Sequence, residues 1–185
     1  EVYSGFNWRV DLSEPAVFWF ETEPPSTFRP HFIGSTSDAS NSWMWGWENI
    51  NGFPDDVVET AASVRDVGAQ LNSLELTTAK LDLGSAERAA GGLPERDDAD
   101  LDYVFAAMAV APIRTPIYYR GPTGEGSYAW FLIDNDESFT LAAPTPLSTV
   151  SAIMDAIGAG LVTDGRLAIE KYSLRRGGVR LVETV

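Results

Sequence analysis

The sequence contains no cysteine and a single histidine, His31, and these absences exclude several kinds of site. Without Cys there is no disulfide, no iron–sulfur cluster, no thiolate zinc site and no cysteine nucleophile. One His excludes a multi-His metal centre within one chain, whereas a carboxylate site for a hard cation stays open. The lack of Cys also fits a reducing compartment, and we expect a cytoplasmic protein.

Long apolar segments are missing as well. No apolar run approaches the roughly 20 residues that a membrane helix needs, so we expect no membrane partner. The segment Glu1-Val2-Tyr3 has no basic region followed by an apolar one, so no signal peptide is visible at this end. Because the first residue is not Met, residues upstream of Glu1 are left open.

Basic residues are scarce. The chain has 13 Lys and Arg against 27 Asp and Glu, which gives a formal net charge of -14. Phosphates would be repelled, so nucleic acid and anionic membranes are excluded as direct partners. An acidic surface suits solubility, a basic protein partner or mimicry of nucleic acid. With 185 residues, 44% of them hydrophobic, the chain fits one globular domain over residues 1–185.

What the chain does have is a concentration of tryptophan. Trp43, Trp45 and Trp47 are half of its 6 Trp and occupy every second position. In a β-strand all three indoles would point to one face. That face is either a core surface covered by amphipathic helices or a partly open aromatic cleft that stacks a flat ligand. Gly46, on the opposite face, leaves room for a close approach.

Strands dominate the first 50 residues. Alternating or continuous apolar residues bounded by turns predict four strands in an antiparallel meander, at residues 6–12, 17–20, 27–36 and 42–49. In the third strand Phe28, Phe32 and Gly34 are expected on one face, and His31 and Ile33 on the other. Pro30 cannot donate a backbone hydrogen bond, which predicts a bulge or an edge there.

Helical spacing predicts three main helices, over residues 56–67, 101–111 and 147–157. Pro54 and the acids after it indicate the first helix start, and Gly68 its end. The acidic run 95–100 is interpreted as the cap of the second helix, which Pro112 ends. Thr145-Pro146 is the expected cap and first position of the third.

The later strands complete an α+β pattern. Strands are predicted at residues 117–120, 128–133 and 139–142, and a closing hairpin at 166–174 and 179–182; residues 70–83 fit either a strand or a helix. We therefore expect a largely antiparallel sheet, made of the N-terminal meander and later hairpins, with three main helices packed on one face.

No strong catalytic, metal or nucleotide motif is present. Asp134, Asp136 and Glu137 resemble half of a calcium loop but lack its Gly and distal Glu, so a turn is favoured. The glycines of 121–126 precede no Lys-Ser/Thr, which indicates a hairpin loop. His31 could act as a lone general base beside Glu48 or Glu21, but a solvent-facing strand His is the favoured interpretation. We expect no catalytic residue, no metal and no cofactor.

Three motifs carry a family resemblance: Phe28-x3-Phe32-Ile33-Gly34-Ser35, Trp43-Met44-Trp45-Gly46-Trp47-Glu48-Asn49, and Tyr118-Tyr119-Arg120-Gly121-Pro122. They resemble an uncharacterised bacterial family, domain of unknown function 6882, marked by Trp-x-Trp-x-Trp-x-Asn. The resemblance covers about residues 27–160; the acidic segment near 84–100 and the C-terminal hairpin depart from it. It implies a bacterial, cytosolic protein and supplies no catalytic residues.

Two functions remain. The first is a non-enzymatic, acidic protein-binding module, in its sharpest version an immunity-type protein that binds a basic toxin. The alternative is a small-molecule receptor or an enzyme with an aromatic cleft along the Trp strand. The candidate binding residues are Trp43, Trp45, Trp47, Glu48, Asn49, Tyr118, Tyr119 and Arg120, with Tyr128 beside them in the cleft.

Burial of the Trp strand discriminates between these hypotheses. A pocket above Trp45 with Glu48 or Asn49 on its rim would favour the receptor or enzyme, whereas indoles buried under the helices would remove the aromatic cleft. Because two amphipathic helices need a sheet face to cover, we expect the indoles to be that face. Function is then expected at the end of the strand, around Glu48 and Asn49.

Overall fold

A computed structural model describes residues 3, 5–84, 100–113, 117–134, 142–160, 162, 164–180 and 182. They fall into two compact units, Glu1–Phe139 and Thr140–Val185, each considered by itself below. The expectation of one domain over the whole chain stays a prediction.

The first unit is built on a curled antiparallel sheet. Its strands are β1 Trp8–Asp11, β2 Val17–Phe20, β3 Ser26–Ser37, β4 Ser42–Trp45, β5 Lys80–Asp82, β6 Ile117–Gly124 and β7 Ser127–Asp134. The strands β1 to β5 follow one another in the sheet, and the β6–β7 hairpin joins it through pairing of β7 with β3. The α+β class, the N-terminal meander and the later hairpin are thus confirmed.

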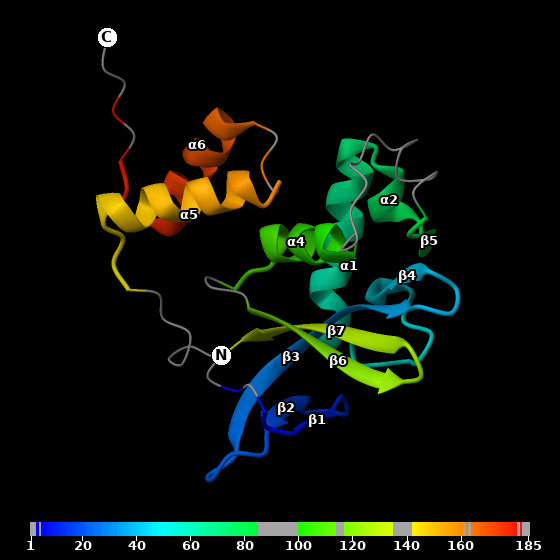
Figure 1. The fold of residues 1–185 in the computed structure, drawn as a ribbon. Coiled ribbons are helices and arrows are strands. Elements are labelled where there is room, and N and C mark those ends of the chain that lie inside the picture. The colour runs from blue at the N-terminus through cyan, green and yellow to red at the C-terminus, as the bar shows by residue number, and fades with distance from the viewer. Residues whose placement is uncertain are drawn as a thin grey trace. The chain divides into compact units, whose positions relative to one another are not determined.

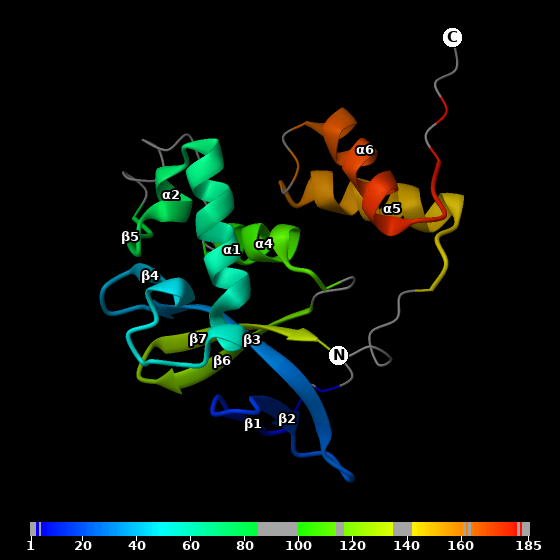
Figure 2. The same cartoon turned by 180° about the vertical axis from the view of Figure 1, so that it is seen from behind.

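Two helices cover one face of this sheet. The helical elements of the first unit are η1 Gly46–Glu48, α1 Asp55–Leu71, α2 Leu74–Thr77 and α4 Asp100–Val110. Both views of the fold place α1 and α4 on one side of β3, β6 and β7, and the β1–β2 hairpin on the other (Figures 1 and 2). The sheet therefore has a helix side and a hairpin side.

Two core clusters lie on the two sides of the sheet, and the first turn of α1, with Val57 and Val58, packs in the cluster of the hairpin side. The helix-facing cluster consists of Ile33, Trp43, Trp45, Val64, Tyr103, Val104, Ala107, Ala111, Ile113, Trp130 and Leu132. The hairpin-facing cluster consists of Phe18, Phe20, Phe28, Phe32, Val57, Val58, Ala129, Phe131 and Ile133. Consecutive residues of β7 alternate between them, as the pleat of a strand requires.

A β-bulge in β3 changes which side its residues face. The register of β3 with β7 shifts between Phe32 and Gly34, so Ile33 is the extra residue. Phe32 packs in the hairpin-facing cluster, whereas a Cβ on Gly34 would lie 2.6 Å from the Trp43 ring, on the helix side. The expectation that Phe32 and Gly34 share a face is wrong, because it assumed an uninterrupted period of two.

The tryptophan stretch is only partly a strand. β4 ends at Trp45, and Trp47 lies in the short 3₁₀ helix η1. Trp43 and Trp45 are buried. Their rings pack edge to face with centroids 5.2 Å apart, and Trp43 also packs against Tyr103 of α4. The expectation that amphipathic helices cover the indoles is confirmed for Trp43 and Trp45, while Trp47 packs at the border of the same cluster.

The helix α1 extends further than its sequence suggests. It begins after Pro54 and ends at Leu71, where Asn72 adopts the left-handed conformation with φ 54°. Gly68 was expected to end the helix. It lies inside α1 instead, where a Cβ would come within 2.4 Å of Leu76, so its role is the close packing of α2. The ambiguous segment 70–83 supplies both α2 and β5.

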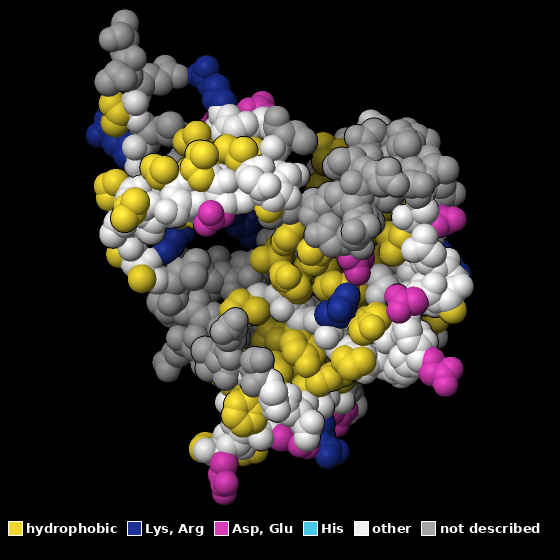
Figure 3. All heavy atoms as spheres, viewed as in Figure 1, with side chains coloured by type: hydrophobic (Ala, Val, Ile, Leu, Met, Phe, Trp, Pro, Cys, Tyr) yellow, Lys and Arg dark blue, Asp and Glu magenta, His cyan; other side chains and the backbone are white. Residues whose placement is uncertain are grey.

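The second unit consists of two helices, α5 Pro146–Gly158 and α6 Gly165–Arg176. The predicted start of α5 is confirmed: Thr145 and Ser148 form a capping box, with Pro146 at the first turn. The predicted closing hairpin is wrong, because residues 166–174 are helical and Asp164 caps them by accepting a hydrogen bond from the backbone of Leu167. Hydrophobic side chains lie exposed along α5 (Figure 3), namely Leu147, Val150, Met154 and Ile157.

Some expectations concern residues that lie outside the described ranges. They are most of the acidic run 95–100, the turn that holds Asp136 and Glu137, and nearly all of the predicted strand 139–142. Among the helices that are described, none combines the length and the apolar character of a membrane-spanning segment.

Candidate functional site

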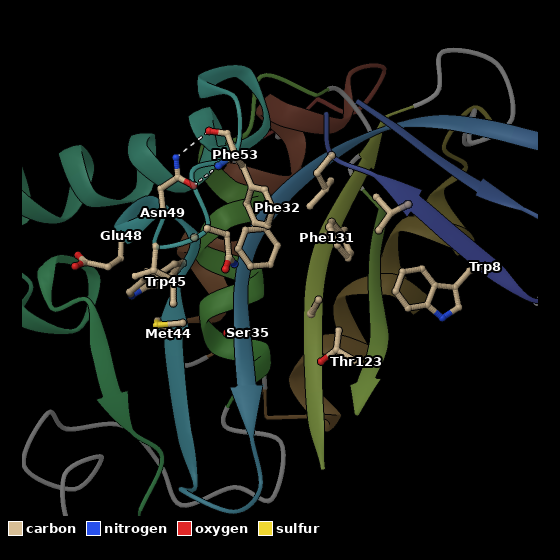
Figure 4. A pocket seen from close by; sticks show the side chains of 16 residues that line it. Trp8, Phe32, Ser35, Met44, Trp45, Glu48, Asn49, Phe53, Thr123 and Phe131 are labelled. Carbon is tan, nitrogen blue, oxygen red and sulfur yellow. Dashed lines mark hydrogen bonds between the residues drawn. The ribbon is translucent and has the colours of Figure 1, made fainter. Parts of the chain in front are cut away.

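The β1–β2 hairpin covers only part of the sheet's hairpin side, and a cavity of about 300 Å³ opens beside it. β1 forms one wall and the segment between β4 and α1 forms the opposite wall, while β3, β4 and β7 provide the floor (Figure 4). The apolar residues that line it are Trp8, Val10, Leu12, Phe32, Met44, Trp45, Ile50, Phe53, Ala129 and Phe131. The polar ones are Ser35, Glu48, Asn49, Asn51 and Thr123. This is a mostly apolar concavity with few polar groups, as small-molecule sites commonly are.

Asn49 fixes the wall beside α1. Its backbone is left-handed with φ 47°, a conformation that Asn adopts more readily than most residues. The side-chain amide of Asn49 donates to the Phe53 carbonyl at 2.9 Å and accepts from the Phe53 N–H at 2.8 Å. Figure 4 shows this pair of bonds holding the segment that carries the Phe53 ring. The amide is therefore engaged in holding the wall rather than offered to a ligand.

Glycines allow the walls to approach the sheet closely. A Cβ on Gly121 of β6 would lie 2.4 Å from the Trp8 ring, so the indole rests directly on the strand. Trp8 also stacks on Phe18, with ring centroids 5.6 Å apart. On the other wall, a Cβ on Gly46 would lie 2.7 Å from the Phe32 carbonyl oxygen, the close approach expected there.

Three of the eight sequence-predicted binding residues line the cavity: Trp45, Glu48 and Asn49. Trp43 is fully buried in the helix-facing cluster. Trp47 lies against the same cluster, with the Arg65 guanidinium over its ring at 5.6 Å. The cavity thus lies at the end of the Trp stretch and does not use a three-indole face.

The remaining three predicted residues lie on both sides of β6. Tyr118 and Arg120 face the helix side. There the Arg120 guanidinium carbon lies 4.5 Å from the centroid of the Tyr128 ring and 5.6 Å from that of the Trp130 ring. Tyr119 points to the hairpin side and packs among Trp8, Phe18 and Phe20. Burial raises the pKa of the Tyr119 hydroxyl. None of these three residues lines the cavity.

Sequence reasoning missed the whole β1 wall. The alternation of Trp8, Val10 and Leu12 predicted a half-buried strand, and the observed burial alternates along β1. Nothing in that pattern says that the hairpin folds over its own sheet. The glycine at position 121, beneath Trp8, is consistent with this packing. It could be interpreted in this way only if β1 and β6 were already known to be neighbours.

His31 does not face solvent as expected; it is buried between β3 and α1, with 3% of its surface exposed. Its Nδ1 lies 3.4 Å from the Thr60 hydroxyl, and its Nε2 has no hydrogen-bond partner among the described residues. Burial lowers the pKa of His31, and the positive charge of Arg29 lowers it further. The carboxylates that oppose this shift are Asp134, Glu59 and Asp56. The imidazole is held neutral as part of the packing, so it does not act as an exposed base.

This burial makes stability depend on pH. The ordinary pKa of His is 6.5, and below it the unfolded chain binds a proton that folded His31 resists. The stabilisation is therefore present above about pH 6.5 and is lost as the pH falls through the lower folded pKa. Urea unfolding between about pH 7.5 and about pH 5.5 is expected to show a falling free energy of unfolding, and His31→Gln to reduce that slope. The same slope in both proteins would contradict this assignment.

No group of three or more His, Cys, Asp or Glu side chains suited to a metal ion occurs within the described ranges. The cavity lining itself offers the burial of apolar surface, with Ser35 and residues at the mouth as polar contacts.

The fold and the cavity define an α+β protein with an apolar site on the partly uncovered face of a curled sheet. The chain belongs to a family of unknown function, DUF6882, whose profile matches residues 2–136. This match starts before β1 and ends within the first unit, so it begins earlier and ends sooner than the resemblance over 27–160 suggested. No match was found among curated proteins or solved structures.

Proposed function

We propose that this protein is a receptor for a small, mostly apolar molecule, bound in the cavity between β1 and the segment that leads into α1. One observation carries the proposal: an apolar cavity of about 300 Å³ whose walls are each fixed by a specific contact. Trp8 on Gly121 fixes one wall and the paired Asn49–Phe53 hydrogen bonds fix the other. A preformed cavity binds at a lower ordering cost than one that must be assembled.

A neutral fluorescent probe tests this proposal. N-phenyl-1-naphthylamine is expected to bind the full chain saturably in a 1:1 complex, with a rise in its fluorescence. Thr123→Trp places an indole at the cavity mouth from an exposed position and is expected to weaken binding about tenfold or more, which corresponds to about 1.4 kcal/mol.

The matched control is Thr78→Trp, the same substitution at an exposed residue outside the cavity lining. It should leave the affinity unchanged. Equal affinities of the two variants would place the probe elsewhere on the chain, and a lack of saturable binding would refute the receptor.

The acidic surface supports a second candidate, an immunity-type module that binds a basic protein. The exposed face of α1 carries Asp55, Asp56, Glu59 and Asp66, with Arg65 as its basic residue. Charge complementarity of this kind accelerates association and is screened by salt. Capture of a basic partner at low salt should be lost when Asp55, Glu59 and Asp66 are replaced by Asn, Gln and Asn. Capture that survives those changes would remove α1 as the contact surface.

Together with either function we propose a bacterial protein in the cytoplasm, and the absence of cysteine supports a reducing compartment.

A further inference from the structure

The described residues that line the cavity carry no positive charge. Neither Lys, Arg nor His is among them. An anionic group inside an apolar cavity loses its hydration, and without a cation or several donors that cost is not recovered. If the cavity binds a small molecule, as proposed above, an anion is disfavoured.

A cation finds little support in the cavity either. Glu48, the one carboxylate among the lining residues that the structure describes, is exposed, and Figure 4 shows it pointing away from the aromatic rings of Phe32 and Phe131. An ion pair at such a solvated rim contributes little. The interior therefore suits an uncharged molecule.

Ser35 is the polar side chain on the floor of the cavity. It is half-buried on β3 and is paired with Met44 of β4 and Ala129 of β7, both of which also line the cavity. Cross-strand partners present their side chains on one face of a sheet, so the Ser35 hydroxyl lies between two apolar neighbours. No hydrogen-bond partner of this hydroxyl is found within the described part of the chain.

From these observations we infer that the receptor selects a neutral, mostly apolar ligand with one hydroxyl or carbonyl group, and that Ser35 hydrogen-bonds this group at the floor. The inference rests on the proposed receptor function and adds its ligand class. A site with one polar group in apolar surroundings discriminates against an analogue that leaves that group unpaired.

Four probes of similar shape test the ligand class by calorimetric titration of the full chain near neutral pH. They are 2-naphthol, 2-methylnaphthalene, 2-naphthoate and 2-naphthylmethylammonium, which differ in hydrogen bonding and charge. We expect 2-naphthol to bind about 2- to 10-fold more tightly than 2-methylnaphthalene, the range that one hydrogen bond contributes. Both charged probes should bind more weakly than either neutral one.

The residue is tested by a cycle of probes and variants. Ser35→Ala should abolish the preference for 2-naphthol over 2-methylnaphthalene while both still bind. Ser37→Ala makes the same change two residues further along β3, outside the cavity lining, and should keep the preference. If Ser35→Ala does not fold, Ser35→Cys, of similar size and with a weaker donor, should reduce the preference instead.

Each outcome has a distinct meaning. A preference for 2-naphthol that persists in the folded Ser35 variant would overturn the role of Ser35. Tighter binding of either charged probe would overturn the neutral ligand class, although the receptor function would stand. Failure of all four probes to bind the wild-type chain, together with failure of the fluorescent probe, would refute the receptor itself.

Discussion

Replacing Trp43 by Ala is expected to lower the free energy of unfolding by about 3–5 kcal/mol, the cost typical of deleting a large buried aromatic side chain. Trp43 is completely buried. Its ring packs against the rings of Trp45, Tyr103 and Trp130, with centroids 5.2, 5.4 and 6.3 Å apart. The indole thereby packs between β4, α4 and β7. Its removal leaves a cavity that these three elements can close only by shifting from their native positions. Urea unfolding measures the effect.

Trp47→Ala provides the comparison. Trp47 lies outside the strand, is only partly buried and borders the same cluster, so about 1 kcal/mol is expected. Equal losses in both variants would contradict the difference in burial. If Trp43→Ala kept the stability of the protein but lost binding of the naphthyl probes, the Trp face would be a ligand-binding surface and not a core surface.

Gly34→Ala is expected to destabilise the protein by about 3 kcal/mol although it adds a single methyl group. The new Cβ would lie 2.6 Å from the Met44 carbonyl oxygen and 2.6 Å from the Trp43 ring. The Met44 oxygen belongs to the backbone and the ring is enclosed, so neither neighbour moves without disturbing the pairing of β3 with β4. Tryptophan fluorescence during urea unfolding measures the loss.

Gly158→Ala is the matched control for that substitution. A Cβ at Gly158 meets no atom of the described residues within 4 Å. All 6 Trp residues lie in the first unit, whereas Gly158 ends α5 in the second. The fluorescence transition should therefore be unchanged by Gly158→Ala. A Gly34→Ala variant with the same midpoint as this control would show that β3 and β4 have more freedom than their contacts indicate.

Local patterns predicted most elements of the fold. Period-two alternation located β1, helical spacing located α1 and α4, and the Thr145-Pro146 signature located the start of α5. The local patterns gave a wrong prediction where the same sequence is compatible with both a strand and a helix. Residues 166–174 were predicted as one strand of a hairpin because Gly177 and Gly178 follow them, but Asp164 caps them as a helix. The cap is a single residue, and its signal is weaker than the apparent hairpin turn.

The candidate site was predictable only at one edge. The end of the Trp stretch indicated Trp45, Glu48 and Asn49, which do line the cavity. The opposite wall depends on how far a hairpin folds over its own sheet, a tertiary property that strand periodicity does not contain. His31 was misjudged for a similar reason, because its burial comes from α1, which crosses β3 from a distant part of the sequence.

The bulge at Ile33 has a consequence for how relatives of this chain should be aligned. Because one extra residue reverses the alternation, odd-numbered positions face the helices before it and even-numbered positions face them after it. Thr36 accepts the Trp130 indole hydrogen bond on the helix side only because of this reversal, and Ser35 reaches the floor for the same reason. A relative lacking one residue here would carry its ligand-facing residue one column earlier, at the position of Gly34. A gap-free comparison would then report a changed ligand contact where only the length of the strand had changed.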